Sequence, residues 1–287
     1  MNTPTNLKIT PTDEACGAWV SGVDLTTELD SKTITAIRRA WLDHKVLAFP
    51  NQQMTDTDLE NFALNFGDYG EDPFFESIPG HEHIAEISRL ADEQAPVFAE
   101  TWHSDWSFQP SPPIATCLYG ITIPSVGGNT GFVNQELALA KMPPELRKKI
   151  EGRVGIHSAE SAYAPDGFYG ENEKDSDRSM KIIASDEAYK RHSHPLIRVH
   201  PETGRETLFS CLGYIIGIED MPDEEARPLL QELLAWQTQE AFQYNHQWRQ
   251  GMLVMWDNRC VLHKASGGYD GQDRILHRVT IAQRAAH

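Results

Sequence analysis

Cysteine is scarce in this sequence of 287 residues, and its four copies stand far apart. No two of them form a Cys-x-x-Cys pair, which excludes a zinc ribbon and a thioredoxin-like redox site. A chain of this length can bury a sizeable core without disulfide bonds. We therefore expect free thiols in a reducing compartment. The four residues are Cys16, Cys117, Cys211 and Cys260.

Long hydrophobic runs are also missing. The longest mostly apolar stretch, Ile114 to Ile123, is interrupted by Gly120 and two threonines. It is too short to cross a bilayer. Residues Met1 to Thr10 lack the apolar segment of a secretory signal peptide. These absences predict a cytoplasmic protein that does not enter membranes.

Basic residues are few relative to acidic ones. The chain has 25 Lys and Arg against 42 Asp and Glu, a net charge of −17. Such a surface repels nucleic-acid phosphates and anionic lipids, so neither is an expected partner. The acidic excess promotes solubility, and it does not determine the charge of a pocket. The expected partner is a small molecule, and a homo-oligomer (dimer or tetramer) is left open.

The pattern of apolar residues predicts a mainly β fold with flanking helices. Residues 34–42 have the apolar spacing of a helix, 46–49 read as a strand, and Thr55 with Asp58 forms a capping-box pattern before a helix that ends at Gly67. Many short strands and few helices favour a β-sandwich or jelly roll over a parallel sheet. Strands are predicted at 84–87, 114–123, 131–134, 196–199, 207–211, 242–248, 252–256 and 276–281, and helical intervals at 136–139 with 143–150 and at 222–238.

We expect one domain over residues 1–287. Within it, residues 161–191 hold glycine, proline and a charged tract, and this composition predicts either a mobile lid over a site or a variable surface loop.

Histidines next to carboxylates or other histidines mark three possible metal sites. They are His81-Glu82-His83, His103-Ser104-Asp105 and His192-Ser193-His194. On an extended strand, the side chains of residues 103 and 105 would point to the same face. One further imidazole would complete a set of two histidines and one carboxylate, which leaves positions on Fe(II) open for a co-substrate and O₂. Trp102, Trp106 and Phe108 surround this pair, and an apolar setting disfavours an uncompensated charge.

Two further segments could supply the missing groups. His263 follows an apolar strand and an Asp-Asn turn, and Arg274 and Arg278 come soon after it. Arginine holds carboxylates by paired hydrogen bonds. Gly127-Gly128-Asn129-Thr130 allows a tight turn whose threonine hydroxyl can donate to a carboxylate. It does not match a dinucleotide or phosphate-binding loop.

These motifs together resemble the taurine/2,4-dichlorophenoxyacetate dioxygenase (TauD/TfdA) family of Fe(II)- and 2-oxoglutarate-dependent oxygenases. The resemblance covers nearly the whole chain, and four motifs in order make it specific. They are Trp-His-Ser-Asp at 102–105, Gly-Gly-Asn-Thr at 127–130, Trp-Asp-Asn-Arg at 256–259 with His263, and Arg-Ile-Leu-His-Arg at 274–278.

The resemblance implies a double-stranded β-helix, a jelly roll of two packed sheets, and a role for each motif residue. His103, Asp105 and His263 would hold Fe(II). Thr130 and Arg274 would bind the distal carboxylate of 2-oxoglutarate. Arg278 would face the near carboxylate of 2-oxoglutarate or an anionic group of the primary substrate. The implied reaction hydroxylates a small organic molecule, such as a sulfonate or an aryloxy acid, and releases succinate and CO₂. A carbon–heteroatom bond would break if the new hydroxyl lies beside the heteroatom.

The substrate end departs from the taurine branch of the family. That branch has asparagine where this chain has Ala99, and it has a histidine in the loop that here reads 69–75 without one. Taurine is therefore not the expected substrate. Trp106, Phe74, Phe75 and Tyr69 could instead form the wall of a pocket for an aromatic acid, or for a quaternary ammonium through cation–π contact.

Two other functions remain open from the sequence. A zinc hydrolase could use the same three ligands, although hydrolysis does not require Thr130 or the two arginines. A non-catalytic jelly-roll protein could retain the metal and keto-acid site as a sensor.

Overall fold

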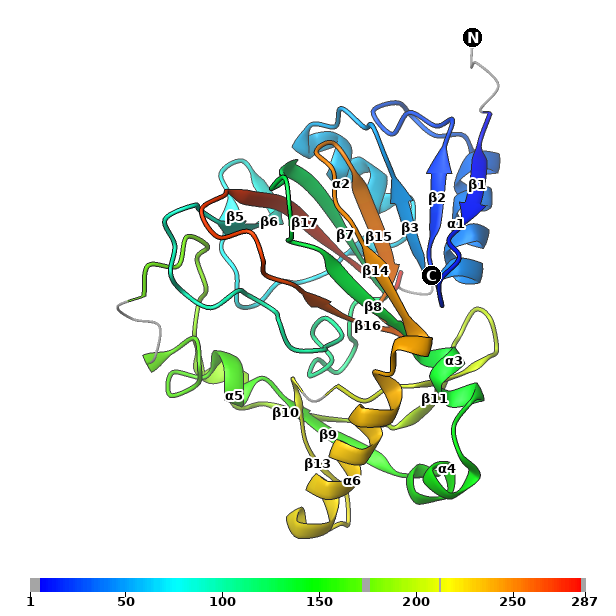
Figure 1. Cartoon of the computed structure of the whole chain (residues 1–287), viewed down its shortest axis with the longest axis vertical. Helices are drawn as coiled ribbons and strands as arrows, with labels where there is room; N and C mark the ends of the chain where they lie inside the picture. Colours follow the sequence, from blue (N-terminus) through cyan, green and yellow to red (C-terminus); the bar gives the residue numbers. More distant parts are fainter. Residues whose placement is uncertain (1–5, 172–175, 212, 285–287) are drawn as a thin grey trace.

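In the computed structural model, which describes residues 6–171, 176–211 and 213–284, most elements are β-strands, and helices lie outside them (Figure 1). Over these residues the largest sheet has the strand order β1-β2-β3-β15-β7-β17-β6-β5, with β4 paired to β17. A second sheet has the order β14-β8-β16, a third has β10-β9-β13, and β11 pairs with β12. The strands are β1 (Lys8–Pro11), β2 (Ala18–Ser21), β3 (Val46–Phe49), β4 (Asp68–Tyr69), β5 (Ser77–Ile78), β6 (His81–Arg89), β7 (Ala115–Thr122), β8 (Thr130–Asn134), β9 (Val154–Ser158), β10 (Arg191–Pro195), β11 (Ile197–Val199), β12 (Glu206–Leu208), β13 (Ile215–Ile218), β14 (Gln243–His246), β15 (Leu253–Asp257), β16 (Val261–Ala265) and β17 (Arg274–Ala282).

The two main sheets enclose a core because successive side chains of a strand point to opposite faces. In β15, Leu253 and Met255 pack on one face of the large sheet with residues of the first two helices. Val254 and Trp256 point the other way and pack against the second sheet, for example on Phe132. These two packed sheets are the predicted jelly roll, which the structure confirms.

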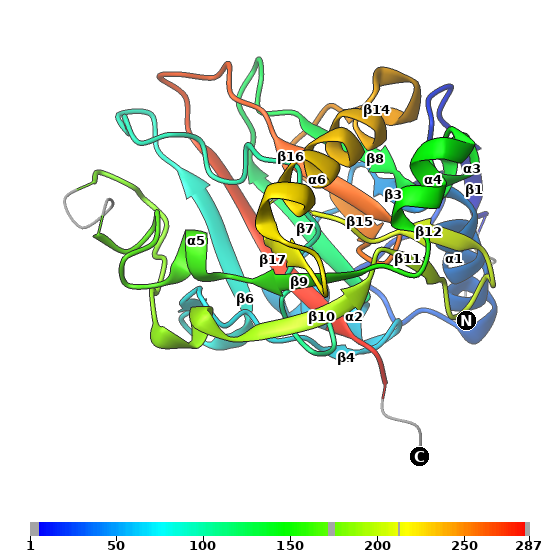
Figure 2. The same ribbon diagram turned by 90° about the horizontal axis from the view of Figure 1, so that it is seen from below.

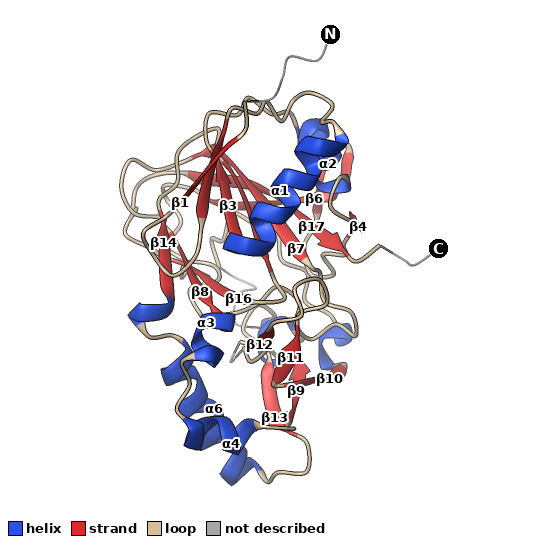
Figure 3. Ribbon diagram, turned by 90° about the vertical axis from the view of Figure 1, so that its right-hand side faces the viewer, coloured by secondary structure: helices blue, strands red, loops and turns tan. Residues whose placement is uncertain are grey.

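Helices cover the outer face of the large sheet (Figure 3). The first begins after Asp30, whose side chain accepts from Thr33 N, and the second has the predicted capping box between Thr55 and Asp58. Both bury apolar side chains such as Trp41 and Phe62 against the sheet. The helices are α1 (Ser31–His44), α2 (Asp56–Leu64), α3 (Gln135–Ala140), α4 (Pro144–Ile150), α5 (Glu160–Tyr163) and α6 (Asp223–Gln237), with short 3₁₀ turns η2 (Asp186–Tyr189) and η3 (Glu240–Phe242).

Most predicted elements are confirmed, and one differs. The helical interval expected at 136–139 with 143–150 forms the two helices α3 and α4, and Pro143 directly precedes the second. The segment around His103 is not an extended strand. His103 forms an isolated bridge with His263, and Asp105 already lies in a turn.

The tract 161–191 lies between the end of β9 and the start of β10 in the chain (Figure 2), and its residues 172–175 are outside the described part. Its second half is fastened to the segment that follows β6. The Asp177 carboxylate accepts hydrogen bonds from the Gln94 and Ala95 amides, and Ile183 N donates to Phe74 O. None of the helices in the described ranges has the length and apolar character needed to span a bilayer.

Candidate active site

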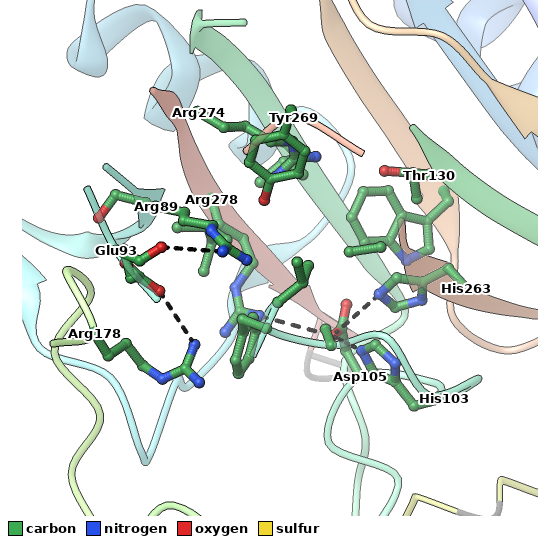
Figure 4. Close-up of a pocket in the computed structure, with 18 residues that line it drawn as sticks. Arg89, Glu93, His103, Asp105, Thr130, Arg178, His263, Tyr269, Arg274 and Arg278 are labelled. Carbon is green, nitrogen blue, oxygen red and sulfur yellow. Dashed lines mark hydrogen bonds and ion pairs between the residues drawn. The ribbon is translucent and has the colours of Figure 1, made fainter. Parts of the chain in front are cut away.

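Four segments far apart in the sequence meet at one end of the space between the two main sheets. His103 comes from the loop before β7, His263 from β16, Thr130 from the start of β8, and Arg274 and Arg278 from β17. Two backbone hydrogen bonds, His103 N to His263 O at 3.0 Å and His263 N to His103 O at 2.7 Å, place the two histidines side by side. Figure 4 shows them with Asp105 on one side of the hollow.

The two imidazoles and the Asp105 carboxylate converge on one point. Asp105 Oδ1 lies 3.8 Å from His103 Nε2 and 3.6 Å from His263 Nε2. One ligand atom from each residue lies within 4.8 Å of the others. His103 Nδ1 is 2.8 Å from Thr101 O, and because a carbonyl only accepts, Nδ1 carries the proton and Nε2 offers its lone pair. The three residues that the sequence singled out are therefore brought together.

A chain of hydrogen bonds orients Asp105. Its second oxygen, Oδ2, accepts from Thr116 Oγ1 at 2.6 Å, and Asn258 Nδ2 donates to the same hydroxyl at 2.9 Å. Oδ1 is thereby left for the histidine side. Such supporting contacts are typical of carboxylates that bind a metal.

Burial sets the charges of this group. It lowers the pKa of His103, and it lowers that of His263 to about 3. Burial alone would raise the pKa of Asp105, but His263, Arg278 and His103 reverse this and lower it. At neutral pH the site offers two neutral imidazoles and one carboxylate, which is the donor set that divalent iron accepts.

A second group of possible ligands, His200, Asp257 and Cys260, does not have these properties. Asp257 already accepts from Arg259 and lies 3.0 Å from His200 Nε2, and burial raises the pKa of Cys260. The Asp257 carboxylate of this group is therefore already paired with Arg259 and His200.

Arg274 and Thr130 lie on another side of the same hollow. Among the described residues no carboxylate forms an ion pair with Arg274, whose Nε donates to Gly128 O at 3.1 Å. Burial lowers the pKa of Arg274 to about 10, with Tyr269 opposing. A buried, still protonated arginine without an acidic partner fits the carboxylate of a bound acid.

The turn that presents Gly128 requires glycine. Gly127 and Gly128 have φ of +70° and +64°, and a Cβ on Gly127 would lie 2.4 Å from Gly268 O. This close approach of two turns brings Thr130 and Arg274 to the same side of the hollow.

Arg278 is buried, and its guanidinium packs on two aromatic rings. Its guanidinium carbon lies 4.5 Å from the Phe75 ring centre and 5.0 Å from that of Trp106. Nη2 donates to Asp72 Oδ1, and Nη1 lies 3.7 Å from Asp105 Oδ1. Burial would lower the pKa of Arg278, but Asp72 and Asp105 raise it. The pKa of Asp72 is raised by burial, and Arg278 opposes this.

Of the five predicted pocket residues, only Ala99 lines a hollow of the site. Ala99 lines both of the hollows described below. Trp106, Phe74 and Phe75 form a buried aromatic layer behind Arg278. Tyr69 is a correction to the sequence prediction, because it lies in β4 and stacks on His83 at 3.9 Å between ring centres, away from both hollows.

Two hollows share the residues Val97, Phe98, Ala99 and His103. The first contains the three converging residues, Arg274 and Arg278, and also Arg89, Glu93, Arg178 and Tyr269. The second is lined by Pro96, Val97, Phe98, Ala99, Glu100, Thr101, His103, Ser161, Ala162, Tyr163, Phe168, Tyr169, Gly213 and Tyr214. The segment 96–101 therefore separates a charged hollow from an aromatic one.

Sequence reasoning missed several residues of these hollows. Asp72 lies in the loop 69–75, where the sequence shows an acidic residue directly before Pro73 but gives no indication of its partner. Glu93 and Arg178 lie 3.8 Å apart but 85 positions apart in the chain, and nothing in the sequence pairs them.

A jelly roll that presents two histidines and a carboxylate beside an unpaired arginine defines the class of 2-oxoglutarate-dependent non-haem iron dioxygenases. The family model described as taurine catabolism dioxygenase TauD, TfdA family, matches residues 8–280. The chain belongs to this family, and it is a 2-oxoglutarate-dependent dioxygenase that hydroxylates a small organic substrate. This excludes the zinc hydrolase and the non-catalytic binding protein that the sequence left open.

Relatives with assigned activities cover nearly the whole chain. An alkylsulfatase of Acinetobacter baylyi is 35% identical over 93% of this chain and 82% of its own length. An alpha-ketoglutarate-dependent 2,4-dichlorophenoxyacetate dioxygenase of Cupriavidus pinatubonensis is 33% identical over 92% of this chain and 93% of its own. Among solved structures, a taurine dioxygenase from Burkholderia xenovorans is 30% identical with a TM-score of 0.79, covering 98% of this chain and 90% of its own.

Proposed function

We propose that His103, Asp105 and His263 hold Fe(II), and that Thr130 and Arg274 bind the distal carboxylate of 2-oxoglutarate. The observation that carries this proposal is the buried Arg274 without an acidic partner, on the same hollow as the three converging ligands. Bound iron, with 2-oxoglutarate and O₂, supplies the oxidation of a substrate C–H bond and releases succinate and CO₂.

The protein's own groups bind and orient. Arg278 Nε is buried without a hydrogen-bond partner among the described residues, and this supports a role for Arg278 beside the near carboxylate of 2-oxoglutarate or beside the primary substrate. The Thr116 hydroxyl keeps Asp105 turned toward the histidines. The aromatic layer of Phe75 and Trp106 excludes water from one side of the site, which strengthens its charge interactions.

The second hollow is the proposed site of the primary substrate. It meets the first at His103, and Phe98, Tyr163, Tyr169 and Tyr214 give it an aromatic lining. This lining fits an aromatic or alkyl body. The substrate carbon would lie next to a heteroatom, so that hydroxylation leads to cleavage of the carbon–heteroatom bond. Relatives named for alkylsulfatase and 2,4-dichlorophenoxyacetate dioxygenase activity support such a substrate.

We also propose a cellular compartment for the protein and a role for the segment 161–191. Four buried, unpaired cysteines support a reducing compartment, the cytoplasm. We propose that residues 1–287 act as one domain, in which the described parts of the segment 161–191 cover the site, since Tyr163 and Arg178 contribute to the two hollows.

The test combines metal binding with turnover. Purified protein is stripped of metal, and its thermal shift on adding Mn(II) with N-oxalylglycine is compared with that of His103→Ala and Asp105→Ala. Both variants should lose the shift and also lose substrate-dependent succinate formation with Fe(II). His192→Ala, outside the site, should behave as wild type. Full succinate formation in either ligand variant would disprove the metal assignment.

The substrate screen measures O₂ uptake with Fe(II), 2-oxoglutarate and ascorbate. It covers sulfonates, aryloxyacetates, phosphonates, sulfate esters and betaines. Reconstitution with Zn(II) in place of Fe(II) should give no O₂ uptake.

A further inference from the structure

Arg278 has a built-in anionic partner in Asp72. The carboxylate of Asp72 accepts from Arg278 Nη2 and also, at 2.6 Å, from the Trp106 indole N–H. Both hydrogen bonds reach the same oxygen, Oδ1, and both partners are donors, which is the pattern of an ionised carboxylate. The arginine that could receive a substrate anion is thus already paired.

The protein holds Asp72 in this position from both sides. Gly70 N donates to Thr280 O at 2.9 Å, and a Cβ on Gly70 would lie 2.6 Å from the Thr280 hydroxyl, so the loop runs directly against β17. Trp106 has φ of +48°, a left-handed conformation that a bulky side chain rarely adopts. Its hydrogen bond to Asp72 and its packing in the aromatic layer stabilise that conformation.

The other charges of the first hollow also have assigned partners. Glu93 lies 3.8 Å from Arg178, and Asp270 lies 3.5 Å from Arg89. Asp105 faces the metal position, and Arg274 is assigned to 2-oxoglutarate. Four arginines line this hollow (Arg89, Arg178, Arg274 and Arg278) against the carboxylates of Glu93 and Asp105, so its charge is positive overall. Asp72 reduces that excess at Arg278.

No lysine or arginine is among the described residues that line the second hollow. Among the described residues that line it, Glu100 carries the only charge apart from the titratable His103. A substrate anion placed there would find no cationic side chain among these lining residues, and one placed beside Arg278 would compete with Asp72.

Resting on the proposed function, we propose that Asp72 determines specificity by neutralising Arg278, so that the substrate is an uncharged molecule with an aromatic or alkyl body. A carboxylate or sulfate at this position would have to displace Asp72 from Arg278. The substrate group that faces this arginine would then be uncharged. In this respect the chain would differ from the 2,4-dichlorophenoxyacetate dioxygenase, which is named for an acid.

Phenoxyacetamide and phenoxyacetate test this proposal because they have nearly the same shape and differ by one charge. Their binding is measured by calorimetry to protein loaded with Mn(II) and N-oxalylglycine, where no turnover occurs. Wild type should bind the amide at least about tenfold more tightly than the acid. Asp72→Asn keeps the size of the side chain and removes its charge, so it should gain affinity for phenoxyacetate by about tenfold or more.

Glu71→Gln, a change of the exposed neighbouring acid, should leave both affinities unchanged. Tighter binding of the acid by wild type would overturn the proposal, and so would Asp72→Asn that folds and gains no affinity for phenoxyacetate. Asp72→Ser serves in the same comparison if Asp72→Asn does not fold. Failure of the proposed function is separate, since it would appear as no succinate formation with Fe(II), while the Mn(II) binding comparison would still report on Asp72.

Discussion

The indole N–H of Trp248 donates to the Thr130 hydroxyl oxygen at 2.9 Å. With this acceptor position taken, the Thr130 O–H remains free to donate toward the hollow beside Arg274. Trp248→Phe should therefore raise the KM for 2-oxoglutarate about three- to tenfold, the equivalent of one hydrogen bond. Trp236→Phe, which removes an indole donor to Ala138 O outside the site, is the matched control. An unchanged KM in Trp248→Phe would show that Thr130 is not oriented in this way.

Arg274 should matter for co-substrate binding through its geometry as well as its charge. Arg274→Gln removes the cation and should weaken N-oxalylglycine binding by a factor of 100 or more, because a buried ion pair is lost. Arg274→Lys keeps the charge but not the paired donors, and it should recover only part of the affinity. Calorimetry on the Mn(II) protein measures both. Equal affinity of Lys and Arg at this position would mean that only the charge is used.

Much of this site could be predicted from the sequence, because short motifs carry it. His103, Asp105, His263, Thr130 and Arg274 lie in local patterns with characteristic spacing, and the structure brings them together. The fold could also be predicted, since strands such as β7 and β15 are mostly apolar runs of the kind that a buried strand produces.

The parts that could not be predicted depend on tertiary contacts. Asp72 is visible in the sequence, but its partner Arg278 is 206 positions away. The two residues meet because β4 pairs with β17. Likewise Tyr69 reads as a pocket aromatic, yet it stacks on His83, because the register of β4 turns it away from the site. The turn at Asp105 could not be predicted from hydrophobic periodicity either. It depends on the left-handed conformation of Trp106, which packing and the hydrogen bond to Asp72 stabilise.

Glu93 should fasten the segment that follows residue 175 over the first hollow. Its Oε2 accepts from Ser179 N at 2.8 Å and from Ser179 Oγ at 2.6 Å, and the side chain is buried. Glu93→Ala should lower the free energy of unfolding by about 3 kcal/mol, since it leaves the two half-buried donors of Ser179 and the Arg178 guanidinium without this carboxylate.

The same variant should show faster hydrogen exchange at residues 176–183 than elsewhere. Glu82→Ala, on an exposed position of β6, is the control and should change neither quantity. Uniform loss of protection over the whole chain would show that Glu93 supports the fold and not this segment in particular.

Two buried histidines outside the metal site should make the protein sensitive to mild acid. Burial lowers the pKa of His157 to about 3, with His194 and Arg198 adding to the effect, and it lowers that of His246 to about 3, with Arg274 adding. In the unfolded chain both would titrate near 6.5. Between these values the unfolded state binds more protons, so the free energy of unfolding falls as pH decreases from about 6.5 and is unaffected by these groups above it.

Each histidine contributes a slope of roughly 1.4 kcal/mol per pH unit. His157→Gln should remove one such slope between pH 6 and 4.5 in urea unfolding of the metal-free protein, whereas His192→Gln should not. An identical pH slope in wild type and His157→Gln would mean that His157 titrates normally in the folded state.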